Sequence, residues 1–291
     1  MASVHSLPAH RFPPLLIALV GVALFSVMDA LMKRASIATG VYSALLFRSL
    51  FGTALMIPVW WLQGGNWPEQ SRLRIHVLRS AVVTGMALLF FFGLVRIPMA
   101  DGIALSFFAP ILALYLAAAS LGEKIRRSAV LASLVGFAGV LVIGAGRLGH
   151  GDYSADAVQG IAAVLGSALL YAWNLVLQRR QAQLASPAEV ALFQNLCVAL
   201  FLASAAPWLA RLPDAAALAD IAAAAALAAA ALMLLAWAYA RAEAQSLVAT
   251  EYSAFAWAAL MGWVWFGEAL TLATLAGAAM IVVACWIAAR K

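Results

Sequence analysis

Long runs of apolar residues occupy almost the whole chain and constrain its fold more than any other feature. Ten runs of about twenty residues are long enough to cross a hydrocarbon core of about 30 Å as helices. The predicted spans are 13–33, 41–62, 76–95, 99–120, 127–146, 158–179, 187–209, 217–240, 244–266 and 271–289. The runs are continuous, without the alternation of membrane β-strands, so we expect an all-α integral membrane protein with ten transmembrane helices.

Composition also indicates that the chain lies in a membrane. Hydrophobic residues make up 66% of the chain and charged residues 10%, and the mean hydropathy is +0.98. A soluble domain carries about 25% charged residues. The residues behind the net charge of +6 are therefore expected to set the orientation of the chain in the membrane. They leave no basic face that could bind nucleic acid. The two cysteines lie inside apolar runs, so neither a disulfide framework nor a cofactor is expected.

The chain carries one pattern twice, at an offset of 145 positions (241 minus 96). The identical pairs are Gly21/Gly166, Arg34/Arg179, Arg96/Arg241, Gly122/Gly267 and Glu123/Glu268. Asp29/Asn174 and Lys33/Gln178 match in kind. A shared register over half of the chain indicates an internal duplication. We therefore divide the chain into a tail (1–12), a first five-helix repeat (13–146), a periplasmic linker (147–157) and a second repeat (158–291).

Lys and Arg residues predict the orientation. With the amino terminus inside, twelve of them fall in cytoplasmic segments and five on the opposite side. This asymmetry favours both termini in the cytoplasm. Five spans per repeat is an odd number, so the second repeat enters the membrane inverted. Inverted repeats are typical of transporters, whose binding site lies near the midplane at the repeat interface.

These features resemble the drug/metabolite transporter superfamily, EamA-type branch. The resemblance rests on the five-plus-five arrangement, on a Gly-Glu ending the fourth and ninth spans, and on small residues in the fifth and tenth. The residues that carry it are Leu121, Gly122, Glu123, Lys124, Gly136, Gly139, Phe266, Gly267, Glu268, Ala269 and Gly277. It covers about residues 13–289, and the chain departs from the pattern at Ala284, where a second Gly is expected.

The resemblance implies an exporter in the bacterial inner (cytoplasmic) membrane. It implies a central cavity lined by spans one, three, four, six, eight and nine, and small metabolites carried by alternating access. Amino acids, aromatic or neutral, are the first expectation; drugs, nucleosides and other metabolites are the alternative. The expected partners are the small-molecule substrate, the lipid bilayer and, as a second candidate ligand, a proton. A monomer and a weak homodimer both stay open.

Three ionisable residues inside predicted spans are candidates for coupling, because a charge in hydrocarbon costs about 2.5–3.5 kcal/mol. Asp29 and Arg48 lie at similar depth from one side and are expected to form an intramembrane ion pair. Glu251 lies about two turns into span nine. It is a candidate to carry a proton or to bind the substrate. The alternatives are an interfacial Asp29 in contact with Lys33, and a packed, neutral Glu251.

The remaining candidates for substrate binding are polar or aromatic residues deep in the spans. Ser106 is the repeat counterpart of Glu251, and Pro110 interrupts the same span. The aromatic and amide candidates are Tyr171, Trp173, Asn174, Tyr252 and Trp257. An aromatic pocket with a few polar groups suits a zwitterion or a flat apolar solute. Packing between helices is the alternative for each of them.

Other patterns have structural interpretations. Gly122 and Gly267 are expected to end helices in the left-handed conformation, with Glu123 and Glu268 near the next helix start. Small residues in spans five and ten are expected to allow close helix packing, within the chain or in a dimer.

Two other function classes lack support. An integral-membrane enzyme would need clustered His or carboxylates, and the four histidines read as scattered in tails and loops. A channel would need a continuous polar stripe. The Gly-rich segment 144–149 matches a dinucleotide fingerprint but follows a membrane helix, and no nucleotide-binding P-loop occurs. The chain is therefore expected to be no enzyme.

Overall fold

The computed structural model describes residues 14–109, 111–112, 115–116, 127–148, 155–182, 184–239, 241 and 252–289, and this part of the chain is helical without strands. The helices are α1 (Pro14–Thr39), α2 (Val41–Leu62), α3 (Gln70–Leu94), α4 (Met99–Ser106), α6 (Arg127–Leu148), α7 (Ala155–Ala182), α8 (Pro187–Ala203), α9 (Ala206–Leu209), α10 (Ala215–Tyr239), α12 (Ser253–Phe266) and α13 (Leu272–Ala289). The predicted tail 1–12 lies outside the described residues.

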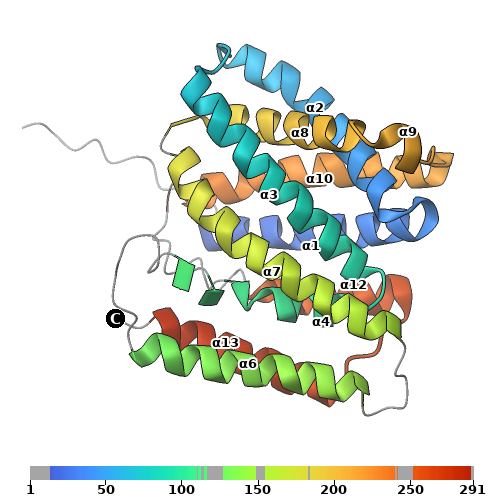
Figure 1. Ribbon diagram of the computed structural model, residues 1–291, viewed down its shortest axis with the longest axis vertical. Coiled ribbons are helices and arrows are strands. Elements are labelled where there is room, and N and C mark those ends of the chain that lie inside the picture. Colours follow the sequence, from blue (N-terminus) through green and yellow to red (C-terminus); the bar gives the residue numbers. More distant parts are fainter. Residues whose placement is uncertain are drawn as a thin grey trace, which may run out of the picture.

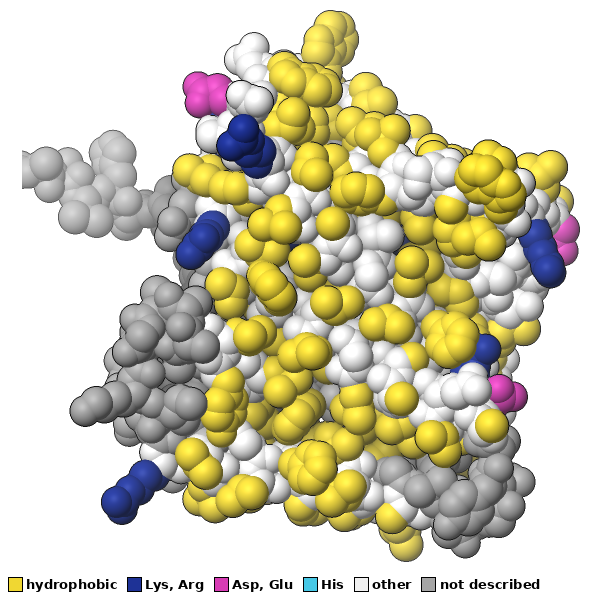
Figure 2. Space-filling model, viewed as in Figure 1, with side chains coloured by type: hydrophobic (Ala, Val, Ile, Leu, Met, Phe, Trp, Pro, Cys, Tyr) yellow, Lys and Arg dark blue, Asp and Glu magenta, His cyan; other side chains and the backbone are white. Residues whose placement is uncertain are grey.

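Length and apolar composition allow five of the described helices to cross a membrane: α1, α2, α3, α7 and α10. Shorter apolar segments lie in α6, α8, α12 and α13. In Figure 2 the charged side chains lie mostly along two opposite rims, with a broad apolar face between them. Leu134, Phe137 and Leu141 of α6 are each more than half exposed. Such a surface is stable against lipid, and we conclude that the bundle is a multi-pass membrane protein.

The first span is longer than predicted. We expected it to end at residue 33, but α1 continues to Thr39. Lys33 and Arg34 do not terminate the helix because both side chains find acidic partners elsewhere in the bundle, Glu268 just after α12 and Asp220 on α10.

The third span also begins earlier than predicted, at Gln70 instead of 76. The placement of His76 in a loop was therefore wrong, since it lies in α3 and is 1% exposed. Arg79 is one of the twelve Lys and Arg residues that we assigned to cytoplasmic segments. It too is buried in this helix. Polar partners on α7 and α8 make this burial possible.

The helices of the two halves interleave. α1 packs along α10, α3 along α7, α2 against α8, and α6 against α13 (Figure 1). Exchanging the two repeats turns the α1–α10 pair into the α7–α3 pair and maps the α2–α8 and α6–α13 pairs onto themselves. A two-fold relation between repeats produces this pairing. It supports the inverted arrangement, which stays a prediction, as do the domain boundaries.

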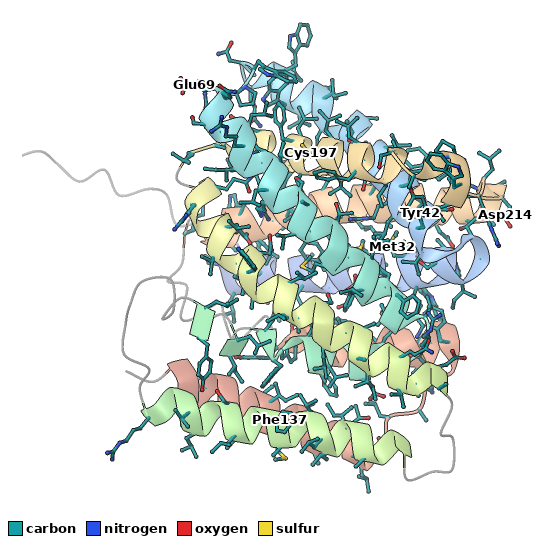
Figure 3. All side chains as sticks on the ribbon, in the orientation of Figure 1. Met32, Tyr42, Glu69, Phe137, Cys197 and Asp214 are labelled. Carbon is teal, nitrogen blue, oxygen red and sulfur yellow. The ribbon has the colours of Figure 1, made fainter. Side chains whose placement is uncertain are left out.

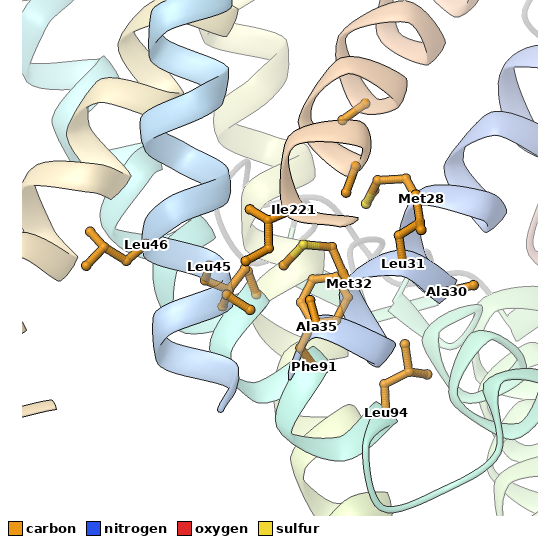
Figure 4. Packing of buried hydrophobic residues seen from close by; sticks show 14 of the residues in the cluster. Met28, Ala30, Leu31, Met32, Ala35, Leu45, Leu46, Phe91, Leu94 and Ile221 are labelled. Carbon is orange, nitrogen blue, oxygen red and sulfur yellow. The ribbon is translucent and has the colours of Figure 1, made fainter. Parts of the chain in front are cut away.

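The largest apolar cluster joins α1, α2, α3 and α10. Met32, Leu45, Phe91 and Ile221 meet there with almost no exposed surface (Figure 4). Lipid is as apolar as these side chains, so close packing stabilises the contact more than exclusion of water does.

Small residues bring α6 and α13 together as the sequence indicated. A methyl group added to Gly139 would lie 2.7 Å from the carbonyl oxygen of Gly277, and one added to Gly277 would lie 2.6 Å from that of Gly139. Ala284 is fully buried in the apolar cluster formed where α6 and α13 pack, so an alanine fits where a second glycine was expected. The close packing predicted for these residues is confirmed within the chain.

The end of α12 has the expected geometry. Gly267 adopts φ 63°, the left-handed conformation, and the N–H of Glu268 donates to the carbonyl of Gly262 at 3.1 Å. The Glu268 side chain, however, reaches the start of α4 instead of the next helix, α13. Gly122, Glu123 and Pro110 lie outside the described residues. α4 ends at Ser106, residues 109, 111–112 and 115–116 are helical again, and the predicted end of the fourth span at residue 120 stays a prediction.

Candidate functional site

Asp29 and Arg48 lie on the two arms of the α1–α2 hairpin, which turns at Gly40. At 1.5 Å per residue, Asp29 lies about 15 Å from the end of α1 and Arg48 about 10 Å from the start of α2. Both residues therefore lie several turns from the hairpin's turn, and both are half-buried.

The two charges interact through space without direct contact. The Asp29 carboxylate and the Arg48 guanidinium influence each other electrostatically. Neither side chain has a hydrogen bond or an ion pair with any described residue, and the buried Arg48 Nε has no acceptor there. Two opposite charges thus lie near one another with their hydrogen-bonding groups uncommitted.

The carboxyl-terminal ends of α1, α3 and α12 meet in a second group of charges, here called the Lys33 end. The Lys33 ammonium forms an ion pair with Glu268 and donates to the carbonyl of Ile97 at 3.0 Å. The other oxygen of Glu268 accepts the Met99 N–H at 2.8 Å. Glu268 therefore stabilises the amino terminus of α4, where a negative charge is favourable.

Two more contacts complete the Lys33 end. Arg34 Nε donates to Asp220 at 2.6 Å, and its Nη2 donates to the other oxygen of that carboxylate. Thr274 Oγ1 donates to Asp101 at 2.5 Å. These contacts, like the Lys33–Glu268 pair, join the first repeat to the second.

A polar chain connects α3, α7 and α8 near the other end of α3, with His76 about 27 Å of helix away from Leu94; this is the His76 end. Arg79 donates from Nε to Asn174 Oδ1 at 2.8 Å and from Nη1 to Gln181 Oε1. Gln181 Nε2 lies 2.5 Å from His76 Nδ1, and His76 Nε2 lies 3.0 Å from Glu189 Oε1. Arg72 contacts the second oxygen of Glu189 at 3.4 Å.

The predicted substrate-binding residues occupy different environments. Asn174 is buried against Arg79, and Tyr171, 36% exposed, interacts electrostatically with the same guanidinium. Trp173 points outward and is 52% exposed, so the structure does not bring it together with Asn174.

The other predicted residues lie on α4 and at or on α12. Ser106 Oγ donates to the Gly102 carbonyl within its own helix at 2.9 Å. Next to it, the Phe107 ring meets the Tyr252 ring edge-on, with centroids 5.4 Å apart. Trp257 is half-buried on α12, and Glu251 lies outside the described residues.

Sequence reasoning missed the His76 end almost entirely. One signal was available: Ser186, Pro187 and Glu189 form a helix start, and Ser186 Oγ accepts the Glu189 N–H at 3.2 Å. That pattern places Glu189 in the first turn of α8. Its partner His76 could be found only by recognising that the polar segment before residue 76 is helical.

Comparisons with known proteins agree with this architecture. A two-repeat helical bundle with opposed charges inside it is the architecture of a membrane transporter. The EamA-like transporter family matches residues 12–145 and 158–290, and the chain belongs to that family. Two repeats therefore cover the chain.

Two relatives are named pseudopaline exporter CntI, from Pseudomonas aeruginosa strains UCBPP-PA14 and PAO1. Each is 28% identical over 273 residues, which is 93% of this chain and 93% of the relative. A solved crystal structure matches with a TM-score of 0.64 and 23% identity, over 95% of this chain and 96% of that one, and shows the fold alone. Family and relatives are transporters, so transport is the activity of the family and an enzymatic role has no support from them.

Proposed function

We propose that the protein exports a small zwitterionic metabolite of the amino-acid type by alternating access, with Asp29 and Arg48 receiving its two charges. The observation that carries this is the pair of opposite, deep charges without a direct partner. On insertion scales the two together cost about 5–7 kcal/mol in hydrocarbon. A ligand with an ammonium and a carboxylate would offset this cost.

The half-buried state of both residues supports an aqueous cavity beside them. A charged group that is partly exposed inside a membrane bundle is stable only where water or a polar ligand reaches it. α12 packs against both α1, which carries Asp29, and α4; Tyr252 lies at the start of α12 and Phe107 at the end of α4, where the two rings meet. An apolar or aromatic substrate side chain would contact such rings.

Export is the proposed direction because the two curated relatives are named exporters. Alternating access has a physical basis in the contacts at the Lys33 end, which join one repeat to the other and would have to open for release. Placement in the bacterial inner membrane with both termini in the cytoplasm belongs to the same proposal. Ser106, Asn174, Tyr252, Trp257 and Glu251 stay candidate substrate contacts.

Transport in proteoliposomes tests the proposal, with amino acids, drugs and nucleosides as the panel. We expect amino acids to be transported. We expect Asp29→Asn to impair selectively the substrates that carry an ammonium group, and Arg48→Gln those that carry a carboxylate, each by about tenfold or more. Deaminated and decarboxylated analogues distinguish the two effects.

A double variant separates ligand binding from an internal ion pair. If the charges serve each other, Asp29→Asn with Arg48→Gln should be less impaired than either single variant. Ligand recognition predicts that both losses persist in the double variant. Asp214→Asn, an exposed acid at the far rim (Figure 3), is the control. Equal transport of all analogues by both single variants would reject the site, and transport of nucleosides or drugs alone would reject the substrate class.

A further inference from the structure

His76 lies between two polar partners in the wall between the repeats. It is 1% exposed, and its ring stacks on Phe193 with a centroid distance of 5.1 Å and an angle of 22°. Nε2 faces the Glu189 carboxylate and Nδ1 faces the Gln181 amide. A buried imidazole with both nitrogens engaged, and a carboxylate on one of them, can hold a proton in a controlled way.

The hydrogen-bond pattern determines which nitrogen carries hydrogen. A guanidinium only donates, so Gln181 Oε1 must accept from Arg79. The amide NH2 of Gln181 therefore faces His76, and Nδ1 must be the acceptor. The ring hydrogen is then on Nε2, which donates to Glu189. In this arrangement His76 is neutral, with one defined tautomer.

Binding of a second proton at Nδ1 is incompatible with this arrangement. The Gln181 amide would have to turn so that its oxygen accepts from Nδ1. The NH2 group of Gln181 would then face the guanidinium of Arg79, and two donors cannot form a hydrogen bond. Arg79 would lose its bond to Gln181, one of the two hydrogen bonds that connect it to α7. Protonation and the closed α3–α7 contact therefore oppose each other.

The surrounding charges reinforce this opposition. On its own helix His76 lies near Arg72 and Arg79, and α8 supplies Glu189. Farther along α8, Cys197 contacts Ser80. From α7, Tyr171 interacts with Arg79, and Arg180 is exposed. α2 adds the apolar Met56 and Trp60 around Phe193. Arg72 and Arg79 are positive and only Glu189 is negative. A third positive charge, on His76, is therefore unfavourable while the α3–α7 contact is closed.

We propose that His76, with Glu189 as its anionic partner, is a proton-binding site of the transport cycle, occupied when the α3–α7 contact opens and empty when it closes. This inference rests on the proposed function, because it names the ion exchanged for the substrate. The earlier candidates for that role were Asp29 and Glu251.

Transport rates measured from about pH 5.5 to 8.5 test the site, because histidine titrates within that interval. We expect His76→Gln to transport with no pH dependence in this range. Gln181→Glu gives Nδ1–H an acceptor without an amide flip, so its pH midpoint should rise by about one unit or more; Glu189→Gln should lower it. Glu69→Gln, an exposed acid at the same end (Figure 3), should leave the profile unchanged.

A second readout does not depend on transport. Nuclear magnetic resonance of ring-labelled histidine follows His76, assigned by its absence in His76→Gln. We expect its ring resonances to shift with pH and to show the opposite responses of the Gln181→Glu and Glu189→Gln variants.

The two readouts separate the possible failures. The folded protein could transport none of the tested substrates while the His76 resonances still shift with pH. That result would reject the proposed function and support the proton site. Transport with a wild-type pH profile in His76→Gln, or a His76 resonance constant across the interval, would overturn the proton site and leave the exporter standing.

Discussion

At the Lys33 end, full charges of opposite sign meet directly, whereas at the His76 end an amide and an imidazole separate Arg79 from Glu189. Lys33 contacts Glu268, and Arg34 contacts Asp220. Arg79, by contrast, is held by the neutral oxygens of Asn174 and Gln181. Both ends join the first repeat to the second. In the proposed alternating-access cycle the two ends open in turn, so the two chemistries offer two different triggers.

The difference lies in what can release each end. Separating a buried ion pair leaves two uncompensated charges, and this needs a competing charge or a large rearrangement. An amide that both donates and accepts can be turned by a single proton at its neighbour. We therefore expect the Lys33 end to contribute more to stability, and the His76 end to respond more to pH.

The largest effect is expected from Lys33→Met. Lys33 is 4% exposed, and its loss leaves the partly buried Glu268 carboxylate, 16% exposed, without a cation. Removing one partner of a buried pair costs about 3–5 kcal/mol. Unfolding by denaturant in detergent, followed by tryptophan fluorescence, should show this loss. Lys33→Met with Glu268→Gln should recover part of it; a double variant as unstable as the single one would contradict the ion-pair account.

Much of the fold could be predicted because lipid imposes a length on each span. α2 occupies the predicted 41–62, and the glycine contacts of α6 and α13 followed from small residues alone. The starts and ends of spans were harder. Lys33, Arg34, Arg79 and His76 looked like flanking residues, because a sequence pattern does not show that a charge has a partner on another helix.

The site was predictable only in part. Asp29 and Arg48 stood out because charge in hydrocarbon is costly. Asn174 was a candidate because it lies deep in its span near Tyr171; the structure buries it against Arg79, a partner that was not expected. The Lys33–Glu268 contact joins residues 235 positions apart, and no local pattern predicts such a contact. Tertiary packing decides these pairs.

A smaller effect is expected from Arg79→Lys at the His76 end. Lysine keeps the charge but cannot donate in a fork to Asn174 and Gln181 together. Loss of one charged hydrogen bond costs about 1.5–3 kcal/mol. Stability should fall by this amount, less than for Lys33→Met. A larger loss than that of Lys33→Met would reverse the proposed ranking of the two ends.

The smallest effect is expected from Arg34→Gln, also at the Lys33 end. Although Arg34 binds Asp220 through two nitrogens, its side chain is 54% exposed. Asp220 is 12% exposed, but solvent reaches the pair from the Arg34 side, so it is screened by salt and contributes less than a pair with both partners buried. The unfolding free energy should therefore change little, and the remaining difference from wild type should shrink as salt is added. Lys33→Met is the internal comparison, since its buried pair should keep its effect in salt. If Arg34→Gln destabilised the protein as much as Lys33→Met, the strength of this end would come from its net charge instead of from burial of one pair.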